Sequence, residues 1–330
     1  MAEALVERGI GATRALVLDG DTILSAHIER DDNGPRAGSV HIGRLVTILE
    51  AGRRGIVKLG DAEALLEPLP RVAEGGLLRV EVVREAVPEV ARPRLAKLRA
   101  IDGAAAGLGE VAPGPDLAAR LAAAGHRVTL LGSQGEDRLE AAGWSETVEA
   151  ARTGHVAFPG GLLTISPTPG MTVIDVDGRD DLVALAEAAA IAAAAAIARF
   201  ELGGSIGVDF PTLAGKLART RLDAVFAEHL PPPFERTAIN GFGFVQVVRP
   251  RLRASFVESV RAPGFAALEL LRRAGRGAPG SRTLTAHPIV VAWLEARPAL
   301  IAALARSVGG TVRLSADPAI AISAGDVDHR

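Results

Sequence analysis

The sequence predicts a mixed α/β protein of several parts, and three patterns carry this prediction. Two short β-branched runs that each end in acid, 171–178 and 202–210, are separated by an alanine-rich segment, as in a strand, a helix and a second strand. Several short strands punctuated by glycine fall between residues 38 and 85, which is typical of a small barrel of the OB type. A helical pattern over 288–308 and a strand over 311–314 predict a small α/β unit near the C-terminal end.

The composition is that of a globular protein without cysteine chemistry. The 330 residues are 48% apolar and 23% charged, and the length suffices for two or three compact units. Because cysteine is absent, disulfides, thiol nucleophiles and cysteine-based zinc sites are excluded. The first residues lack the layout of a signal peptide, and the longest apolar run, Ala188–Ala198, is too short and too rich in alanine to span a bilayer. We therefore expect a cytoplasmic protein with no membrane partner.

The charge is distributed unevenly along the chain, although the net charge is only −2. Residues 210–330 carry 16 Lys and Arg against 9 Asp and Glu, whereas residues 1–209 carry 21 against 30. Nearly all of these cations are arginines, whose planar guanidinium suits phosphate. This favours a nucleic-acid partner. A GC-rich genome would produce the same arginine-rich and alanine-rich composition, so that alternative stays open.

The N-terminal part predicts a β-hairpin, short strands, a linker and two helices. The tip Asp19-Gly20-Asp21 is a turn signal within a hairpin over 13–30. The further expected elements are strands over 39–49, 55–59, 64–66, 76–84 and 127–131, a linker over 86–115, and helices over 116–124 and 136–152.

The C-terminal part predicts two strands before a long helix. This helix can be capped by Asp180 or Asp181 and runs to about Phe200. The further expected elements are strands over 157–166, 171–176 and 243–248, a helix over 213–229 that the three prolines from Pro231 stop, and a break over 272–282.

Three aspartates are the strongest candidates for a functional site. Asp175 and Asp177 lie two residues apart on one predicted strand and so face the same side, and Asp209 ends the next strand. A short right-handed crossover makes the two strands neighbours, and open sheets bind ligands at the carboxyl ends of their strands. Carboxylates there would hold a hard cation such as Mg²⁺. The alternative is that each aspartate caps the following helix. The seven histidines show no ligand spacing.

Three arginines are candidates for phosphate contacts. Arg249, Arg251 and Arg253 alternate along an extended segment around Pro250, which predicts a ridge of guanidinium groups on one side. A solvated strand edge with charges that prevent aggregation explains the same spacing.

Two further pairs of residues are candidates for RNA contacts but also have a purely structural interpretation. Lys216 and Arg219 follow the last aspartate at near-helical spacing and could face a phosphate, but a plain amphipathic helix explains them equally well. Phe242 and Phe244 fit core positions better than base-stacking platforms.

Three motifs occur in order in the middle of the chain: Phe158-Pro-Gly-Gly-Leu-Leu-Thr-Ile, Thr172-Val-Ile-Asp-Val-Asp-Gly178 and Leu202-Gly-Gly-Ser-Ile-Gly-Val-Asp-Phe210. Together they resemble the catalytic core of the ribonuclease E/G family. That family has a Pro-x-Gly-Gly strand, an Ile-Asp-x-Asn segment and a Leu-Gly-Gly-x-Ile-x-x-Asp-Phe segment. The similarity extends over most of the chain but rests mainly on residues 150–260.

The resemblance implies a fold of four parts. They are an RNase-H-like subdomain over 1–36 and 95–157, an S1-type OB barrel over 37–86, a DNase-I-like catalytic domain over 158–262, and a small C-terminal domain over 263–330.

The resemblance also implies an endonuclease that hydrolyses single-stranded RNA to 5′-phosphate products and uses Mg²⁺, with Mn²⁺ as an alternative ion. Asp175 and Asp209 match the catalytic metal-binding aspartates of the family, and Asp177 stands where the family has asparagine. The candidate RNA-contacting residues are Arg249, Arg251, Arg253, Lys216, Arg219, Arg179, Phe242 and Arg44.

Several features depart from the family. The Cys-Pro-x-Cys zinc link is missing, so neither zinc nor a zinc-linked dimer is expected, and the sequence specifies no oligomeric state. The subdomain that senses the RNA 5′ end is largely deleted. Ile56 and Leu65 stand where the family's barrel has phenylalanines, and aliphatic side chains lack the π-face that stacks on a base for roughly 1–3 kcal/mol.

These departures leave two alternatives to the endonuclease. The first is a catalytically weak or inactive RNA-binding protein, for example one that acts on ribosomal RNA. The second is a metal-dependent phosphoesterase with a substrate smaller than RNA.

Overall fold

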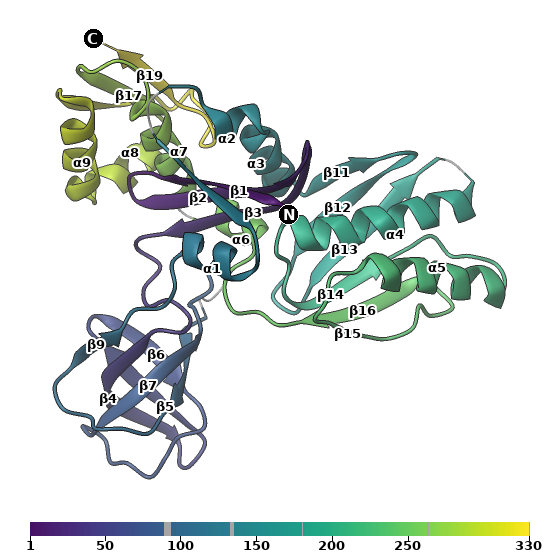
Figure 1. Ribbon diagram of the computed structural model, residues 1–330, viewed down its shortest axis with the longest axis horizontal. Helices are drawn as coiled ribbons and strands as arrows, with labels where there is room; N and C mark the ends of the chain where they lie inside the picture. The colour runs from purple at the N-terminus through teal and green to yellow at the C-terminus, as the bar shows by residue number, and fades with distance from the viewer. Residues whose placement is uncertain (89–93, 133–134, 180, 263, 330) are drawn as a thin grey trace.

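A computed structural model describes residues 1–88, 94–132, 135–179, 181–262 and 264–329 (Figure 1). The chain forms a mixed α+β fold with four sheets in these residues, which confirms the predicted class. A barrel lies at one end, below an N-terminal sheet, and a larger sheet with two helices extends to the side (Figure 1).

The N-terminal sheet combines the start of the chain with a segment that follows the barrel. Its strand order is β10-β1-β2-β3, and β10 is parallel to β1. The predicted hairpin corresponds to β2 and β3, whereas sequence patterns did not predict β1. The helix expected over 136–152 is interrupted at Gly143, which has a φ of 95°. The elements are β1 (Glu3–Arg8), β2 (Ala12–Asp19), β3 (Thr22–Arg30), β10 (Arg127–Leu131), α1 (Leu117–Ala123), α2 (Arg138–Ala141) and α3 (Trp144–Thr153).

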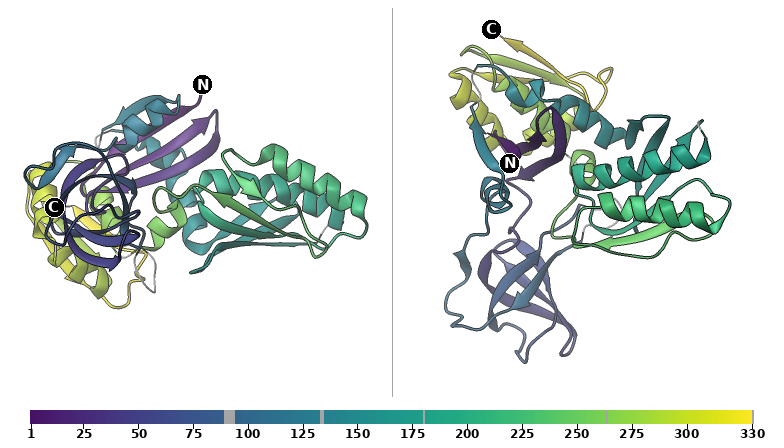
Figure 2. Two further views of the ribbon diagram at one scale, coloured as in Figure 1. Left: turned by 90° about the horizontal axis from the view of Figure 1, so that it is seen from below. Right: turned by 45° about the vertical axis from the view of Figure 1, so that its right-hand side comes forward.

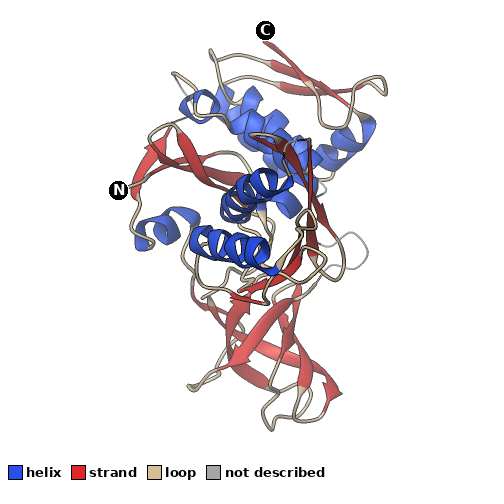
Figure 3. Ribbon diagram, turned by 90° about the vertical axis from the view of Figure 1, so that its right-hand side faces the viewer, coloured by secondary structure: helices blue, strands red, loops and turns tan. Residues whose placement is uncertain are grey.

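The barrel closes through five strands, because β4 pairs with both β5 and β7 in the order β4-β5-β6-β8-β7. This closed barrel is compatible with an OB-like fold. It contains strands and loops but no helix in its described part (Figure 3). A sixth strand, β9, pairs with β4 from outside. The strands are β4 (Val40–Glu50), β5 (Arg54–Leu59), β6 (Ala62–Leu66), β7 (Leu77–Arg84), β8 (Ala96–Ala100) and β9 (Gly109–Ala112).

The linker expected over 86–115 is wrong for its described second part, which supplies β8 and β9. In β8, buried Ala96 and Leu98 alternate with more exposed cations, as expected for a strand. This alternation covers few residues and lies within a segment rich in proline, glycine and alanine, so the sequence did not reveal the strand. The five strands of the barrel therefore extend to Ala100 and do not end at residue 86, and β9 follows outside the barrel. Residues 89–93 lie outside the described part of the chain.

The central sheet has the order β11-β12-β13-β14-β16-β15. The predicted strand, helix and parallel strand are confirmed as β13, α4 and β14. The single strand expected over 157–166 is a hairpin of β11 and β12, because the chain turns at Gly160 with a φ of 88°. The elements are β11 (His155–Phe158), β12 (Gly161–Pro167), β13 (Thr172–Gly178), α4 (Leu182–Arg199), β14 (Gly204–Asp209), α5 (Lys216–His229), β15 (Glu235–Arg236) and β16 (Phe244–Arg249).

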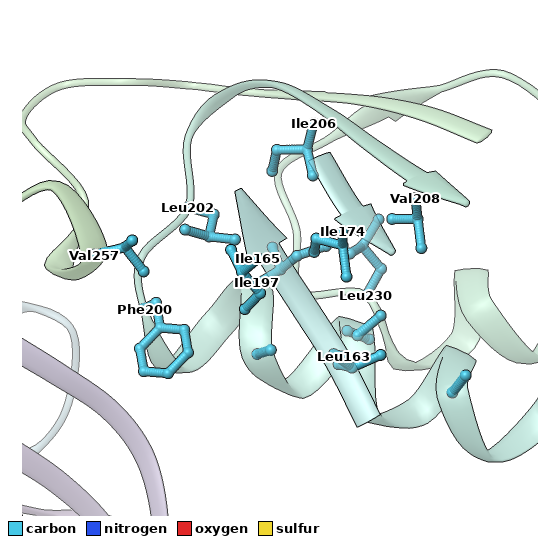
Figure 4. Packing of buried hydrophobic residues seen from close by; sticks show 14 of the residues in the cluster. Leu163, Ile165, Ile174, Ile197, Phe200, Leu202, Ile206, Val208, Leu230 and Val257 are labelled. Carbon is cyan, nitrogen blue, oxygen red and sulfur yellow. The ribbon is translucent and has the colours of Figure 1, made fainter. Parts of the chain in front are cut away.

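Helices α4 and α5 cover one face of the central sheet and leave the other face without a helix (Figure 2). Asp181 caps α4 by accepting hydrogen bonds from the backbone N–H groups of Val183 and Ala184, while Asp180 lies outside the described residues. The helix has the length and apolarity of a membrane span, yet eight of its residues, mostly alanines, are buried against the sheet. Figure 4 shows this core around Ile197 and Phe200.

The C-terminal unit packs three helices against a small sheet of order β18-β17-β19. The helix expected over 288–308 is two helices, bent by 90° where Pro298 starts the second. The break expected over 272–282 begins later, because α7 continues to Ala274. The elements are α6 (Phe256–Arg261), which joins the units, α7 (Phe265–Ala274), β17 (Arg282–Ala286), α8 (Pro288–Glu295), α9 (Pro298–Val308), β18 (Val312–Ala316) and β19 (Asp326–His329).

A buried ion-pair network ties the C-terminal unit to the N-terminal sheet. Arg272 of α7 is 6% exposed and donates to Glu7 of β1, which is 3% exposed, at 2.7 Å. The same guanidinium contacts Asp137 at 2.6 Å, and Arg276 contacts Glu7 at 2.9 Å. Removing one partner of such a pair leaves a buried charge without compensation.

We expect Arg272→Ala to lower the free energy of unfolding by about 3 kcal/mol, the low end for a broken buried pair, because Arg276 still contacts Glu7. The neighbouring Arg273 is exposed, so Arg273→Ala should change stability by less than about 0.5 kcal/mol. Urea unfolding followed by tryptophan fluorescence measures both. Equal midpoints for the two variants would show that the network contributes nothing.

Candidate metal and RNA-binding site

Two of the predicted aspartates stand side by side on the helix-free face of the central sheet. Asp175 of β13 and Asp209 of β14 are register partners in parallel strands, which lie about 4.8 Å apart. Their neighbours Ile174 and Val208 are fully buried under the helices, so both carboxylates point to the opposite face, where they are exposed. The fold therefore brings these two residues together, as the sequence predicted.

The aspartate pair belongs to a row of side chains that crosses four strands. Thr164 of β12 is the register partner of Asp175, and Phe244 of β16 is the partner of Asp209. Phe244 is half-buried on the helix-free face, where its ring covers Gly207, since a Cβ there would lie 2.6 Å from the ring. Sequence patterns did not reveal Thr164, because the register of β12 cannot be read from the chain.

The third aspartate lies one row farther along β13. Asp177 pairs with Leu162 and, with Arg179, lines a shallow pocket of about 450 Å³, which three glycines also line. Two residues along a strand correspond to about 6.6 Å, so Asp177 is offset from the pair.

The two adjacent carboxylates fit an open magnesium site better than a closed cage. Within the described residues, no group of three His, Cys, Asp or Glu side chains is placed to share one ion. Mg²⁺ commonly binds through one or two carboxylates and completes its octahedron with water and substrate phosphate. Asp175 and Asp209 meet that requirement, whereas Asp177 lies one row away from them.

Phe242 does not occupy the core, so the core interpretation of this residue is wrong. Its side chain is 81% exposed at the tip of the turn before β16. The side-chain oxygen of Asn240 accepts hydrogen bonds from the backbone N–H groups of Phe242 and Phe244, at 2.9 and 3.1 Å. Gly243 has a φ of 96°, and a Cβ there would lie 2.1 Å from the carbonyl oxygen of Phe210. The turn is thus held from both sides.

The predicted ridge of three arginines is also wrong, because each guanidinium is drawn into the protein. Arg249 is half-buried and donates to a backbone carbonyl before β14 at 3.1 Å, and burial lowers its pKa. Arg251 forms an ion pair with Glu258 of α6. Arg253 lies 3.7 Å from Glu85 at the base of the barrel. These residues join the central sheet to its neighbours and offer no common exposed side.

Lys216 and Arg219 lie at the start of α5, on the helix-covered side of the sheet. Lys216 is exposed, and Arg219 donates to the carbonyl of Leu213 at 3.2 Å. A phosphate held by the aspartates would be on the other face, so these cations could contact RNA only around the edge of the sheet.

The barrel carries the predicted aliphatic pair on its outer face. Ile56 of β5 and Leu65 of β6 are register partners, and both are half-buried. Arg44 is exposed on β4 opposite Lys58 and donates to the carbonyl of Gly75 at 2.8 Å. In OB folds the face of the second and third strands contacts oligonucleotides, and β5 and β6 are the second and third strands of this barrel along the chain.

One polar relay that sequence patterns missed connects the N-terminal sheet to the loop before β14. His27 of β3 bonds Glu201 through Nδ1 at 2.7 Å and Ser25 through Nε2 at 2.7 Å. Glu201 has a φ of 50°, the only positive φ of a non-glycine residue in the described chain. Burial raises the pKa of Glu201, but the charges of His27, Arg253 and Arg120 outweigh it and hold the pKa below its ordinary value.

Comparison with models of known protein families and with curated proteins finds no match. The resemblance to the ribonuclease E/G family therefore stays a prediction from the motifs.

We expect Glu201→Gln to lower stability by about 1–3 kcal/mol at pH 7, because His27 loses its charged acceptor. A depressed carboxyl pKa stabilises the fold above the unfolded value of about 4.3, and this contribution disappears as the pH falls through the folded pKa. The difference between wild type and variant should therefore begin to shrink below about pH 4.3 and vanish once the pH lies below the folded pKa. Urea unfolding over a pH series measures it, with the exposed Glu228→Gln as the control. A difference that is constant with pH would contradict this assignment.

Proposed function

We propose that this protein is an Mg²⁺-dependent endonuclease of single-stranded RNA. The observation that carries the proposal is the register pairing of Asp175 and Asp209 on the bare face of the central sheet. The closed barrel is compatible with an OB fold, which commonly binds single-stranded nucleic acid, and this supports RNA as the substrate.

The finer fold assignment is part of this proposal. In it the central sheet with helices on one face is the DNase-I-like domain, the N-terminal sheet is the RNase-H-like subdomain, and the barrel is the S1-type domain.

In the proposed reaction the row on the sheet binds the scissile phosphodiester. Bound Mg²⁺ would supply Lewis-acid polarisation of the phosphate and lower the pKa of water. Asp175 and Asp209 would hold the ion, and the hydroxyl of Thr164, in the same row, would donate to a phosphate oxygen. Water adds to phosphorus while the bond to the 3′ oxygen breaks, and that oxygen takes up the proton. The products are a 5′-phosphate and a 3′-hydroxyl.

A catalytically weak RNA-binding protein is the second candidate. Two observations favour it: the aliphatic pair Ile56 and Leu65 on the barrel, and the absence, within the described residues, of a third metal-binding group beside Asp175 and Asp209.

We expect Asp175→Asn and Asp209→Asn each to reduce Mg²⁺-dependent cleavage of a 5′-labelled single-stranded RNA by at least about 100-fold, because even changes around metal ligands cost 10–100-fold. Asp177→Asn should cost less, since this residue lies one row away. The exposed Glu228→Gln on α5 is the matched control and should cleave like wild type.

Cleavage that persists in both aspartate variants would contradict the proposed site. A protein that does not cleave but binds RNA with an affinity that falls steeply with salt would favour the second candidate.

A further inference from the structure

The aromatic side chains of this chain are distributed unevenly. No Phe, Trp or Tyr occurs before Trp144, so the barrel and the N-terminal strands contain none. All nine Phe and two Trp lie in the described residues, and all but Phe242 are buried or half-buried. Phe242 is 81% exposed. Phe242 is thus the aromatic side chain in the described residues whose π-face is open to solvent, and a π-face is the group on which an unpaired base can stack.

The turn that carries Phe242 is built to hold the ring outside. The carbonyl oxygen of Phe242 accepts a hydrogen bond from Thr212 Oγ1 at 2.9 Å, and the N–H of Phe242 donates to the side-chain oxygen of Asn240. The N–H of Gly243 donates to the carbonyl of Asn240 at 3.2 Å, which closes the turn. Because the backbone is fixed, little conformational freedom is lost when the ring binds a partner.

The turn that carries Phe242 also leads directly into the strand beside the candidate metal site. Phe242 precedes Phe244 by two residues, at most about 7 Å of chain, and Phe244 is the register partner of Asp209. A strand whose phosphate sits over Asp175 and Asp209 would pass this turn at the edge of the sheet. The barrel meanwhile offers only Ile56 and Leu65 where a base would stack.

We propose that Phe242 is the stacking platform for a base adjacent to the phosphate held at Asp175 and Asp209. This inference rests on the proposed function and deepens it. The aromatic contact that the barrel lacks is supplied by the catalytic sheet itself. Stacking uses the face of a base, which every base has, so the preference is for an unpaired nucleotide and tolerates its identity.

RNA binding to non-cleaving protein tests the proposal. In the Asp175→Asn background, fluorescence anisotropy with a labelled single-stranded oligouridine should show about 5- to 140-fold weaker binding for Phe242→Leu, the range for losing one stacked base. Phe242→Trp should retain or increase the affinity. Leu217→Ala is the matched control, because this apolar side chain is 84% exposed on α5 and should have no effect.

An abasic scan separates stacking from a general change of the surface. Removing one base at a time should weaken binding to the Phe242 protein at one position of the oligonucleotide. At that position the Phe242→Leu protein should be indifferent to the missing base. If the missing base and the Phe242→Leu substitution weaken binding independently and additively, the proposal is overturned. It is also overturned if the Phe242→Leu protein binds RNA as tightly as the protein with Phe242, and the exposed ring would then be assigned to a contact with another protein.

These experiments distinguish failure of the stacking proposal from failure of the proposed endonuclease function. Aspartate-dependent cleavage with unchanged binding by Phe242→Leu overturns the stacking role alone. Binding that depends on Phe242 in a protein that never cleaves supports stacking and overturns the endonuclease. A wild-type protein that binds no RNA overturns both.

Discussion

The packing of α4 against the central sheet is the constraint on which the rest of the structure depends. Its buried positions are mainly alanines, which add little bulk and favour the helix, so that the helix can lie close to the strands. A helix in this place returns the chain to the sheet through a right-handed crossover, which makes the new strand parallel to the one before it. β14 therefore lies beside β13, and Asp209 comes opposite Asp175. The candidate site is a consequence of apolar packing on the far side of the sheet.

The sequence could predict β13, α4 and β14 because two signals agree in this segment. The first is the difference in periodicity between the β-branched runs and the alanine-rich segment. The second is that each of the two β-branched runs ends in aspartate. What the sequence could not supply was the register, since one residue of slip would place Asp209 beside Ile174 or Val176 and turn it to the other face. Thr164 and Phe244 join the row only through that register, so they could not be named in advance.

The errors have a different physical origin, because each involves a partner far away in the chain. Alternation predicted an extended segment through Arg249, Arg251 and Arg253, but β16 ends at Arg249. The acids that draw the other two arginines inward are Glu258 on α6 and Glu85 at the barrel. Local spacing contains no information about such partners. β8 was missed for a related reason: its five residues become a strand only when the barrel closes around them.

Phe242 and the relay at Glu201 show how the site depends on its surroundings. Core positions were predicted for Phe242 and Phe244, yet the left-handed turn at Gly243 leaves the ring of Phe242 in solvent. Glu201 holds a strained backbone immediately before β14, and the compensating contact comes from His27 on the N-terminal sheet. The strand that ends in Asp209 is therefore positioned from three directions: by α4 beneath it, by the N-terminal sheet at its start, and by the Phe242 turn at its end. The proposed ion site of two carboxylates would have few ligands of its own to fix its geometry, so this external support would provide the rigidity that a larger ligand set otherwise gives.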